Sequence, residues 1–200
     1  MQHAAHHAPL KTDEFAHPRK NVAAFRVREG QSVADLGAGS GAYTFPIAEA
    51  LGPTGRIYAI DVQKDLLRRI SNEATRRGLK NVEVLWADLE VPRSSKLADG
   101  SMDLVLISNL LFQVPDKLPL LREARRIVKP GGIVVIIDWS DSFGPSGRFR
   151  ASGMGPLRED VVNKESALKL AKEATLTLDR EFTAGAHHYG LVLKPRPYSP

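Results

Sequence analysis

Three glycines at alternate positions follow a short apolar run that contains a carboxylate. The run is Val33–Leu36 with Asp35 inside it, and the glycines are Gly37, Gly39 and Gly41. Glycine is needed where the backbone turns sharply and a ligand approaches the main chain closely. The pattern therefore predicts a buried strand that leads through a tight turn into a helix, which is typical of a nucleotide-binding loop.

The residues of this loop leave two kinds of nucleotide open. With Ala42, the loop fits the looser dinucleotide pattern G-x-G-x-x-A, which is weak evidence on its own. The carboxylate of Asp35 weighs against a dinucleotide, because a negative charge directed into the loop repels a pyrophosphate. The same charge suits a ligand that carries an ammonium or sulfonium group.

Two further carboxylates end the next two predicted strands. Asp61 lies about twenty residues past the loop, where a carboxylate can accept hydrogen bonds from both hydroxyls of a ribose. Asp88 follows the third strand, where it can hold an adenine amino group. Each acid alone is equally well explained as a helix cap or a turn former. Together with the glycines, the three acids predict a ligand pocket at the carboxyl edge of a parallel sheet.

Apolar runs alternate with helical patterns, which predicts βαβ units. Strands are predicted at Ser32–Leu36, Arg56–Ile60, Val82–Trp86, Met102–Ile107 and Ile133–Ile137. Because these runs are continuously apolar, we expect helices on both faces of the sheet. A helix is predicted from Asn163, as N-cap, to Glu173. Two later runs, 176–182 and 188–193, have no helix between them and predict an antiparallel hairpin with a turn at 183–187.

The composition bounds the class of protein. A chain of 200 residues with 42% hydrophobic residues is long enough for one α/β domain. The sequence has no cysteine, which excludes disulfides and thiolate metal sites and suits a cytoplasmic protein. No apolar run approaches the ~20 residues of a membrane helix, so we expect no membrane span. We also predict no metal centre.

The motifs resemble those of the class I S-adenosylmethionine-dependent methyltransferases, over about residues 20–195. The residues that carry the resemblance are Asp35–Gly41, Asp61, Asp88–Leu89, Met102–Asn109 and Leu121–Val135, the last including Lys129–Gly132. The sequence is most similar to the small-molecule branch that includes quinone-biosynthesis methyltransferases.

This resemblance implies a Rossmann-like, doubly wound α/β fold with seven strands in the order 3-2-1-4-5-7-6, strand 7 antiparallel, and helices on both faces. The sequence pattern itself predicts one domain over residues 15–200 behind a flexible tail at 1–14, where histidines lie among alanines. The resemblance also implies S-adenosylmethionine as cofactor. The implied cofactor-binding residues are Asp35, Gly37, Ala38, Gly39, Gly41, Asp61, Val62, Asp88, Leu89 and Ser108.

Methyl transfer from a sulfonium is an in-line displacement on carbon, so the protein supplies mainly alignment and exclusion of water. Acceptor-binding candidates at the same edge of the sheet are Asn109, Asp138, Trp139 and Tyr189. His187 and His188 are candidate general bases, because histidine titrates near neutral pH. The alternative is that one histidine packs inside while the other faces solvent. The loop 140–158 is predicted to be either a lid or disordered.

Three functions stay open on the sequence. The first is methyl transfer to O, N or C of a small molecule. The second is an NAD(P)-dependent oxidoreductase, against which stand Asp35 and the lack of a Tyr-x-x-x-Lys pair. The third is a non-catalytic cofactor- or RNA-binding module that uses the arginines of 68–80 and 122–129. Without interleaved aromatic residues these arginines are better explained as solvent faces of helices, so we do not expect a nucleic-acid partner. The oligomeric state stays open.

Overall fold

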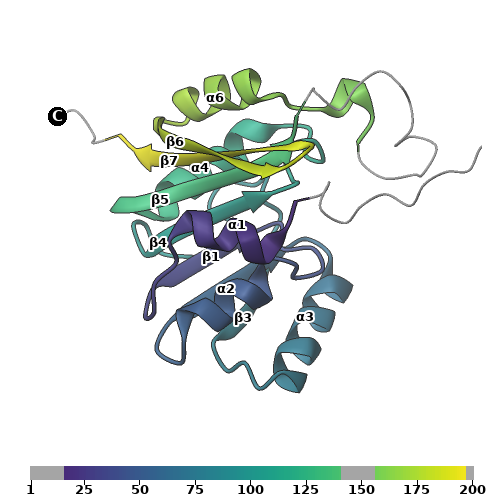
Figure 1. Cartoon of the computed structure of the whole chain (residues 1–200), viewed down its shortest axis with the longest axis vertical. Helices are drawn as coiled ribbons and strands as arrows, with labels where there is room; N and C mark the ends of the chain where they lie inside the picture. Colours follow the sequence, from purple (N-terminus) through teal and green to yellow (C-terminus); the bar gives the residue numbers. More distant parts are fainter. Residues whose placement is uncertain (1–15, 141–155, 197–200) are drawn as a thin grey trace, which may run out of the picture.

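The computed structural model describes residues 16–140 and 156–196, which form one seven-stranded sheet in the order β3-β2-β1-β4-β5-β7-β6 (Figure 1). The strands are β1 (Ser32–Leu36), β2 (Arg56–Asp61), β3 (Val82–Trp86), β4 (Met102–Ser108), β5 (Val128–Trp139), β6 (Leu176–Gly185) and β7 (His188–Pro195). The first five strands run parallel, and β7 runs antiparallel to both of its neighbours. The predicted order and the antiparallel strand are therefore confirmed.

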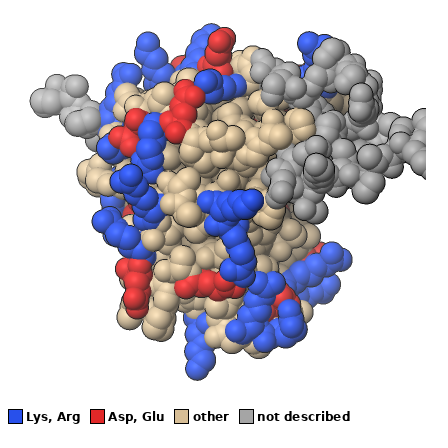
Figure 2. Space-filling model, viewed as in Figure 1, with Lys and Arg blue, Asp and Glu red and all other residues tan. Residues whose placement is uncertain are grey.

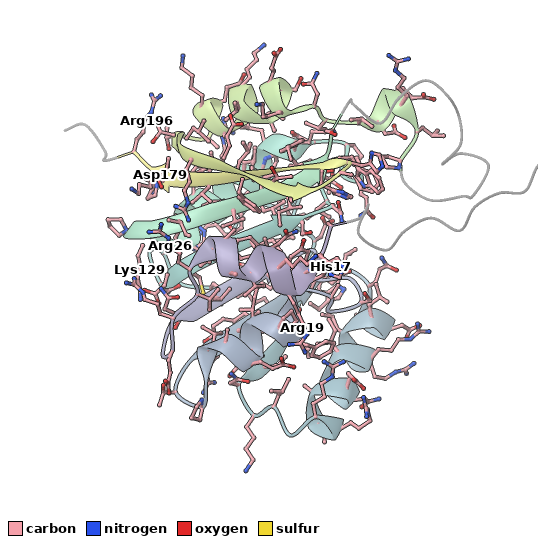
Figure 3. All side chains as sticks on the ribbon, viewed as in Figure 1. His17, Arg19, Arg26, Lys129, Asp179 and Arg196 are labelled. Atoms are coloured by element: carbon pink, nitrogen blue, oxygen red, sulfur yellow. The ribbon has the colours of Figure 1, made fainter. Side chains whose placement is uncertain are left out.

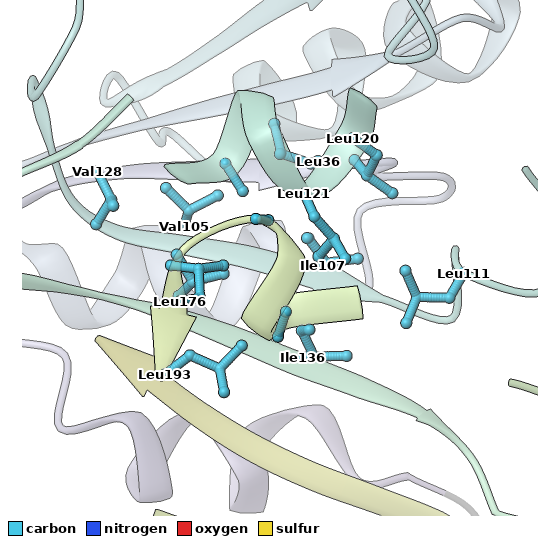
Figure 4. Packing of buried hydrophobic residues seen from close by; sticks show 14 of the residues in the cluster. Leu36, Val105, Ile107, Leu111, Leu120, Leu121, Val128, Ile136, Leu176 and Leu193 are labelled. Carbon is cyan, nitrogen blue, oxygen red and sulfur yellow. The ribbon is translucent and has the colours of Figure 1, made fainter. Parts of the chain in front are cut away.

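Helices cover both faces of this sheet, as expected from its continuously apolar strands (Figure 1). They are α1 (Pro18–Phe25), α2 (Thr44–Leu51), α3 (Lys64–Arg76), α4 (Lys117–Ile127) and α6 (Lys164–Glu173), with a short 3-10 helix at Arg158–Asp160. Apolar side chains of α1, α2 and α3 pack on one face. Those of α4 and α6 pack on the other face, whose core is drawn in Figure 4. Asn163 caps α6 as predicted, because its side chain accepts a hydrogen bond from the N–H of Ser166.

The alternation of side chains in β1 decides which face each residue serves. Val33 packs with α1 and α2, whereas Ala34 and Leu36 pack with α4 and α6. Leu36 is labelled in Figure 4. Asp35 therefore points to the same face as Val33, towards α2. Val33, Ala34 and Leu36 of β1 are fully buried, as is Ile107 of the neighbouring strand β4. The middle of the sheet is therefore apolar at these positions.

Three predictions about the elements need correction. No helix forms between Trp86 and Met102, where the chain consists of turns and irregular segments. Strand β5 begins at Val128, directly after α4, so Lys129–Gly132 lies inside the strand and does not precede it. The hairpin turn is only two residues long, since β6 continues to Gly185 and β7 begins at His188.

Two neighbouring glycines at the start of β5 differ sharply in the space around them. A Cβ on Gly132 would lie 2.8 Å from the carbonyl oxygen of Asp103 and 3.0 Å from that of Met102, whereas a Cβ on Gly131 meets nothing within 4 Å. Strand β4 thus approaches β5 so closely that only glycine fits at Gly132.

We predict that Gly132→Ala lowers the free energy of unfolding by about 1–3 kcal/mol, because backbone atoms of β4 must shift to admit the methyl group. Gly131→Ala is the matched control and should change stability by less than about 1 kcal/mol. Urea unfolding of the two variants measures the difference. Equal stability of both variants would contradict the close approach of β4 and β5.

Candidate functional site

A pocket of about 220 Å³ lies at the carboxyl ends of β1, β2 and β3, next to the segment that follows β4. Its walls come from four separate segments of the chain. The lining residues are Gly37, Gly39, Asp61, Val62, Gln63, Ala87, Asp88, Leu89, Glu90, Leu110, Gln113 and Val114. Six of the residues that the sequence assigns to a cofactor are therefore brought together here: Gly37, Gly39, Asp61, Val62, Asp88 and Leu89.

The glycine loop is held against the end of β2 by its own N–H groups. The N–H of Gly37 and that of Ala38 both donate to the carbonyl of Ile60, at 2.8 and 3.0 Å. The N–H of Gly39 donates to Oδ2 of Asp61 at 2.9 Å. Three glycines of the loop have positive φ (75°, 54° and 81°), a conformation that L side chains rarely adopt.

Each glycine of the loop also faces a different neighbour. A Cβ on Gly37 would lie 2.7 Å from the side chain of Leu110, and a Cβ on Gly41 would lie 2.8 Å from that of Phe45. A Cβ on Gly39 would have no neighbour nearer than 3.9 Å. Gly37 and Gly41 thus allow the loop to pack, while Gly39 keeps its backbone open to the pocket.

The pocket has a strongly negative lining. Asp61, Asp88 and Glu90 contribute carboxylates, and no Lys or Arg is among its described lining residues. Backbone donors fix the first two, since Oδ1 of Asp61 accepts from the N–H of Gln63 at 2.8 Å and Oδ1 of Asp88 accepts from the N–H of Glu90 at 3.0 Å. Such a lining repels phosphate groups and attracts a cationic ligand.

Asp35 does not line this pocket, contrary to the expectation that its carboxylate is directed into the loop. It is 2% exposed, and its Oδ2 accepts a hydrogen bond from the hydroxyl of Thr44 on α2 at 2.6 Å. Burial raises the pKa of Asp35 to about 6, the Thr44 hydroxyl opposes this, and the negative charge of Asp61 adds to it. Asp35 therefore acts on the pocket through its field and through α2, without lining it.

Ala38, Gly41 and Ser108 also lie outside the lining. Ala38 packs in the small core between the sheet, α2 and α3. Gly41 lies just before α2, and its carbonyl accepts a hydrogen bond from the N–H of Phe45 in this helix. Ser108 ends β4, and its side chain forms a hydrogen bond with the hydroxyl of Tyr43. Burial raises the pKa of Tyr43 to about 12, although the hydrogen bond with Ser108 acts in the opposite direction. These residues thus support the loop from behind.

A buried polar network that the sequence analysis missed links the loop to α1. The side-chain N–H₂ of Asn21 donates to the Tyr43 hydroxyl and to the carbonyl of Ala184, each at 2.9 Å. Asn21 and Tyr43 are 4% and 6% exposed, so these bonds form away from water. No local pattern marks this network, because Ala184 lies 163 positions from Asn21. The pocket residues Leu110, Gln113 and Val114 were also missed, because they lie in an irregular segment after β4 that no periodic pattern marks.

Two residues predicted to bind an acceptor have other tasks in the structure. Asp138 is fully buried, and its oxygens accept hydrogen bonds from the N–H groups of Leu111 and Trp139 at 2.9 and 2.8 Å. Burial raises its pKa to about 7, against the lowering effect of these bonds. The hydroxyl of Tyr189 donates to the carbonyl of Val162 at 2.9 Å. Both polar groups form hydrogen bonds within the fold, and their role towards an acceptor stays a prediction.

The two histidines differ in environment. His188 is 6% exposed, its ring lies 4.3 Å from that of Trp139, and neither ring nitrogen has a hydrogen-bond partner among the described residues. Burial lowers the pKa of His188 to about 4, and the neighbouring His187 contributes to the shift. His187 occupies the two-residue turn and is only half-buried. His188 is thus a neutral, buried imidazole at the carboxyl edge.

Asn109 has two unusual features directly after β4. Its φ is 51°, in the left-handed region, and its buried Oδ1 has no hydrogen-bond partner within the described chain. Strained backbone and an unsatisfied polar atom both concentrate at functional sites. Most of the predicted lid, 141–155, and the predicted tail, 1–14, lie outside the described residues.

The basic residues of the helices are largely paired with acids. On α3, Arg76 and Arg77 both bind Glu73, at 2.6 Å each, and Figure 2 shows blue and red side chains close together over this helix. On α4, the guanidinium of Arg126 binds Glu123 at 2.7 Å. This pairing favours the interpretation of these arginines as solvent faces over an RNA-binding surface.

A family model described as a methyltransferase domain matches residues 28–185. The chain belongs to this methyltransferase family. Among curated relatives, demethylmenaquinone methyltransferase of Bacillus velezensis is 36% identical over 122 residues, or 60% of this chain and 51% of the relative. The demethylmenaquinone methyltransferase of Geobacillus stearothermophilus is 34% identical over 115 residues, which are 57% of this chain and 47% of the relative. The methyltransferase domain spans about half the length of these relatives.

Solved structures agree with the family. A SAM-dependent methyltransferase from Aquifex aeolicus matches with a TM-score of 0.78 and 27% identity, over 93% of each chain. The PH0226 protein from Pyrococcus horikoshii matches in fold, with a TM-score of 0.73 and 20% identity over 90% of this chain and 88% of that one. In the described part of the methyltransferase domain, no helix has the length and apolarity needed to cross a membrane, and no group of three or more acids or histidines is arranged for a metal ion.

The buried carboxyl of Asp35 makes the stability of the methyltransferase domain depend on pH. Between about pH 4 and pH 6 the folded state keeps this proton while the unfolded state loses it, so the folded state loses stability as the pH rises. We predict that Asp35→Asn, which has no such proton, gains stability relative to the wild type by about 3 kcal/mol across this range.

Denaturant unfolding of both proteins from pH 4 to pH 7 measures this difference. Asp65→Asn on the exposed surface of α3 supplies the baseline, since the side chain of Asp65 is 78% exposed. A difference between Asp35→Asn and wild type that stays constant with pH would contradict the raised pKa of the buried Asp35 carboxyl.

Proposed function

We propose that this chain is an S-adenosylmethionine-dependent methyltransferase that acts on a small molecule. The observation that carries the proposal is the pocket at the carboxyl edge, where three carboxylates and no cationic side chain line the described wall. A sulfonium and an amino-acid ammonium are attracted to such a wall, whereas a pyrophosphate is repelled. No observation favours the nicotinamide alternative.

The residues present fit an adenosyl ligand. Each carboxylate oxygen of Asp61 accepts one hydrogen bond from a backbone N–H, and each retains a lone pair that can accept a second one from a ribose hydroxyl. Val62 and Leu89 supply apolar surface for an adenine, and Asp88 supplies an acceptor for its amino group. When bound, this cofactor supplies a methyl group activated by a positively charged sulfur.

We propose that the acceptor is small and planar. Support comes from Trp139 and His188, whose rings lie 4.3 Å apart at the carboxyl edge with a tilt of 40° between their planes, and from the unsatisfied Oδ1 of Asn109. It comes also from the relatives named for demethylmenaquinone, a quinone. His188 is the candidate base, because a neutral imidazole with no hydrogen-bond partner in the described chain can accept a proton. We further propose a single domain over 15–200 and a cytoplasmic location, the latter from the cysteine-free sequence.

Calorimetric titration tests the cofactor. We expect S-adenosylmethionine and S-adenosylhomocysteine to bind and NADH not to bind, because the pocket lining offers NADH no cation for its pyrophosphate. Asp61→Ala should weaken S-adenosylhomocysteine binding by about tenfold to a hundredfold, since two hydrogen bonds to a charged group are lost. Asp65→Ala, on the exposed surface of α3, is the control and should bind as wild type does. Tight NADH binding with no response to S-adenosylhomocysteine would reverse the proposal.

The pH dependence of turnover tests His188 as the base, with demethylmenaquinone as the first acceptor to try. His188→Gln should lower kcat at saturating cofactor by at least about tenfold, within the usual range for a general base. Because the pKa of His188 is lowered to about 4, wild-type kcat should persist below pH 6 and fall only as the pH approaches that value. His187→Gln is the matched control. Unchanged turnover in His188→Gln would remove this residue from the mechanism.

A further inference from the structure

A second, larger pocket of about 520 Å³ lies at the opposite edge of the sheet from the glycine loop. Its walls are the residues that follow α1, the amino end of β4, the start of β5 and one side chain from β6. Figure 3 shows Arg26 and Lys129 at this edge, at the far end of α1 from His17 and Arg19. Strand β1 separates the two pockets by about 15 Å, at ~3.3 Å per residue. A ligand here therefore cannot be part of the methyl-transfer site.

The charge of this pocket is the reverse of that at the carboxyl edge. Its cationic lining residues are Arg26, Arg28, Lys129 and Arg180, and its only described acidic lining residue is Asp103. Lys129 Nζ lies 2.7 Å from Oδ1 of Asp103, and Arg180 Nη1 lies 3.0 Å from Asp179 just outside the pocket. Figure 2 shows Lys and Arg side chains along the corresponding left edge of the molecule.

Two of the four cations have no ion-pair partner among the described residues. Within the described part of the chain, neither Arg26 nor Arg28 forms an ion pair, and both residues are exposed. Burial alone raises the pKa of Asp103, but Lys129, the Ser32 N–H and the charge of Arg28 together hold it below its usual range. The single carboxylate is therefore already neutralised, and the pocket keeps an excess of positive charge.

Two of the cationic residues, Arg180 and Arg26, have unusual local features. Nη2 of Arg180 donates to the carbonyl of Ala24 at 2.9 Å, which holds its guanidinium against the end of α1. Arg26 ends this helix with φ 56° and ψ 44°, in the left-handed region where glycine or asparagine is usual. Arginine is less stable than glycine in this backbone conformation. We therefore expect that the function of Arg26 depends on its side chain, which lines the pocket.

We propose that this pocket binds the phosphate group of a small phosphorylated molecule. Guanidinium groups present paired N–H donors that match phosphate oxygens, and Arg26, Arg28 and Arg180 line one cavity. The volume exceeds that of a bare phosphate ion and falls in the range of small-molecule sites. The site is independent of the proposed methyl transfer, because its evidence lies at the other edge of the sheet.

Isothermal titration with pyrophosphate and with ADP at low ionic strength tests the site in the full chain. We expect saturable binding of both, weakened by added salt. Equal affinity shows recognition of the phosphates alone, and tighter ADP binding shows that the pocket also holds the nucleoside. Absence of saturable binding of either compound would overturn the proposal.

Substitutions locate the binding. Arg26→Gly removes the guanidinium but suits the left-handed backbone, so the variant should stay folded while its pyrophosphate affinity falls at least about fivefold. Arg26→Glu with Arg28→Glu should abolish binding. Arg68→Glu with Arg69→Glu, on the exposed side of α3, makes the same change in net charge and should leave binding nearly unchanged. Equal losses in both double variants, or unchanged affinity in Arg26→Gly, would show only diffuse attraction and contradict the site.

Discussion

The carboxylate of Asp61 ties the glycine loop to the end of β2. One oxygen accepts the N–H of Gly39 at 2.9 Å and the other accepts the N–H of Gln63 at 2.8 Å, so one side chain holds the turns that follow two adjacent strands. This bond forms only because the parallel register of β1 and β2 places Leu36 beside Ile60. The register in turn requires the apolar side chains of both strands to be buried on both faces. The pocket is thus a product of the sheet as a whole.

Charge is distributed unevenly between the two edges of this sheet. Carboxylates that end β2 and β3 line the carboxyl edge, while guanidinium groups around the end of α1 line the amino edge. Most of the buried side chains of the strands between them are apolar. Each edge therefore selects ligands of opposite sign, a cationic adenosyl donor at one and a phosphate at the other, and neither ligand suits the other pocket.

Continuous apolar runs predicted the five parallel strands well, because burial on both faces leaves a strong local signal. The positions of Asp61 and Asp88 were predictable for the same reason, since each directly follows such a run. The directions and partners of individual polar side chains were not predictable from the sequence. Asp35 bonds to α2, Asp138 holds the segment after β4, and Tyr189 reaches the carbonyl of Val162. These partners are set by how helices and loops dock on the sheet, which no local pattern records.

We propose above all that the carboxyl-edge pocket holds an adenosyl group against Asp61. A crystal structure of the full chain with S-adenosylhomocysteine tests it most directly. The account predicts the ribose hydroxyls within hydrogen-bond distance of the Asp61 carboxylate and the adenine amino group beside Asp88, with the glycine loop essentially as described. An adenosine bound elsewhere, or a ribose turned away from Asp61, would contradict it.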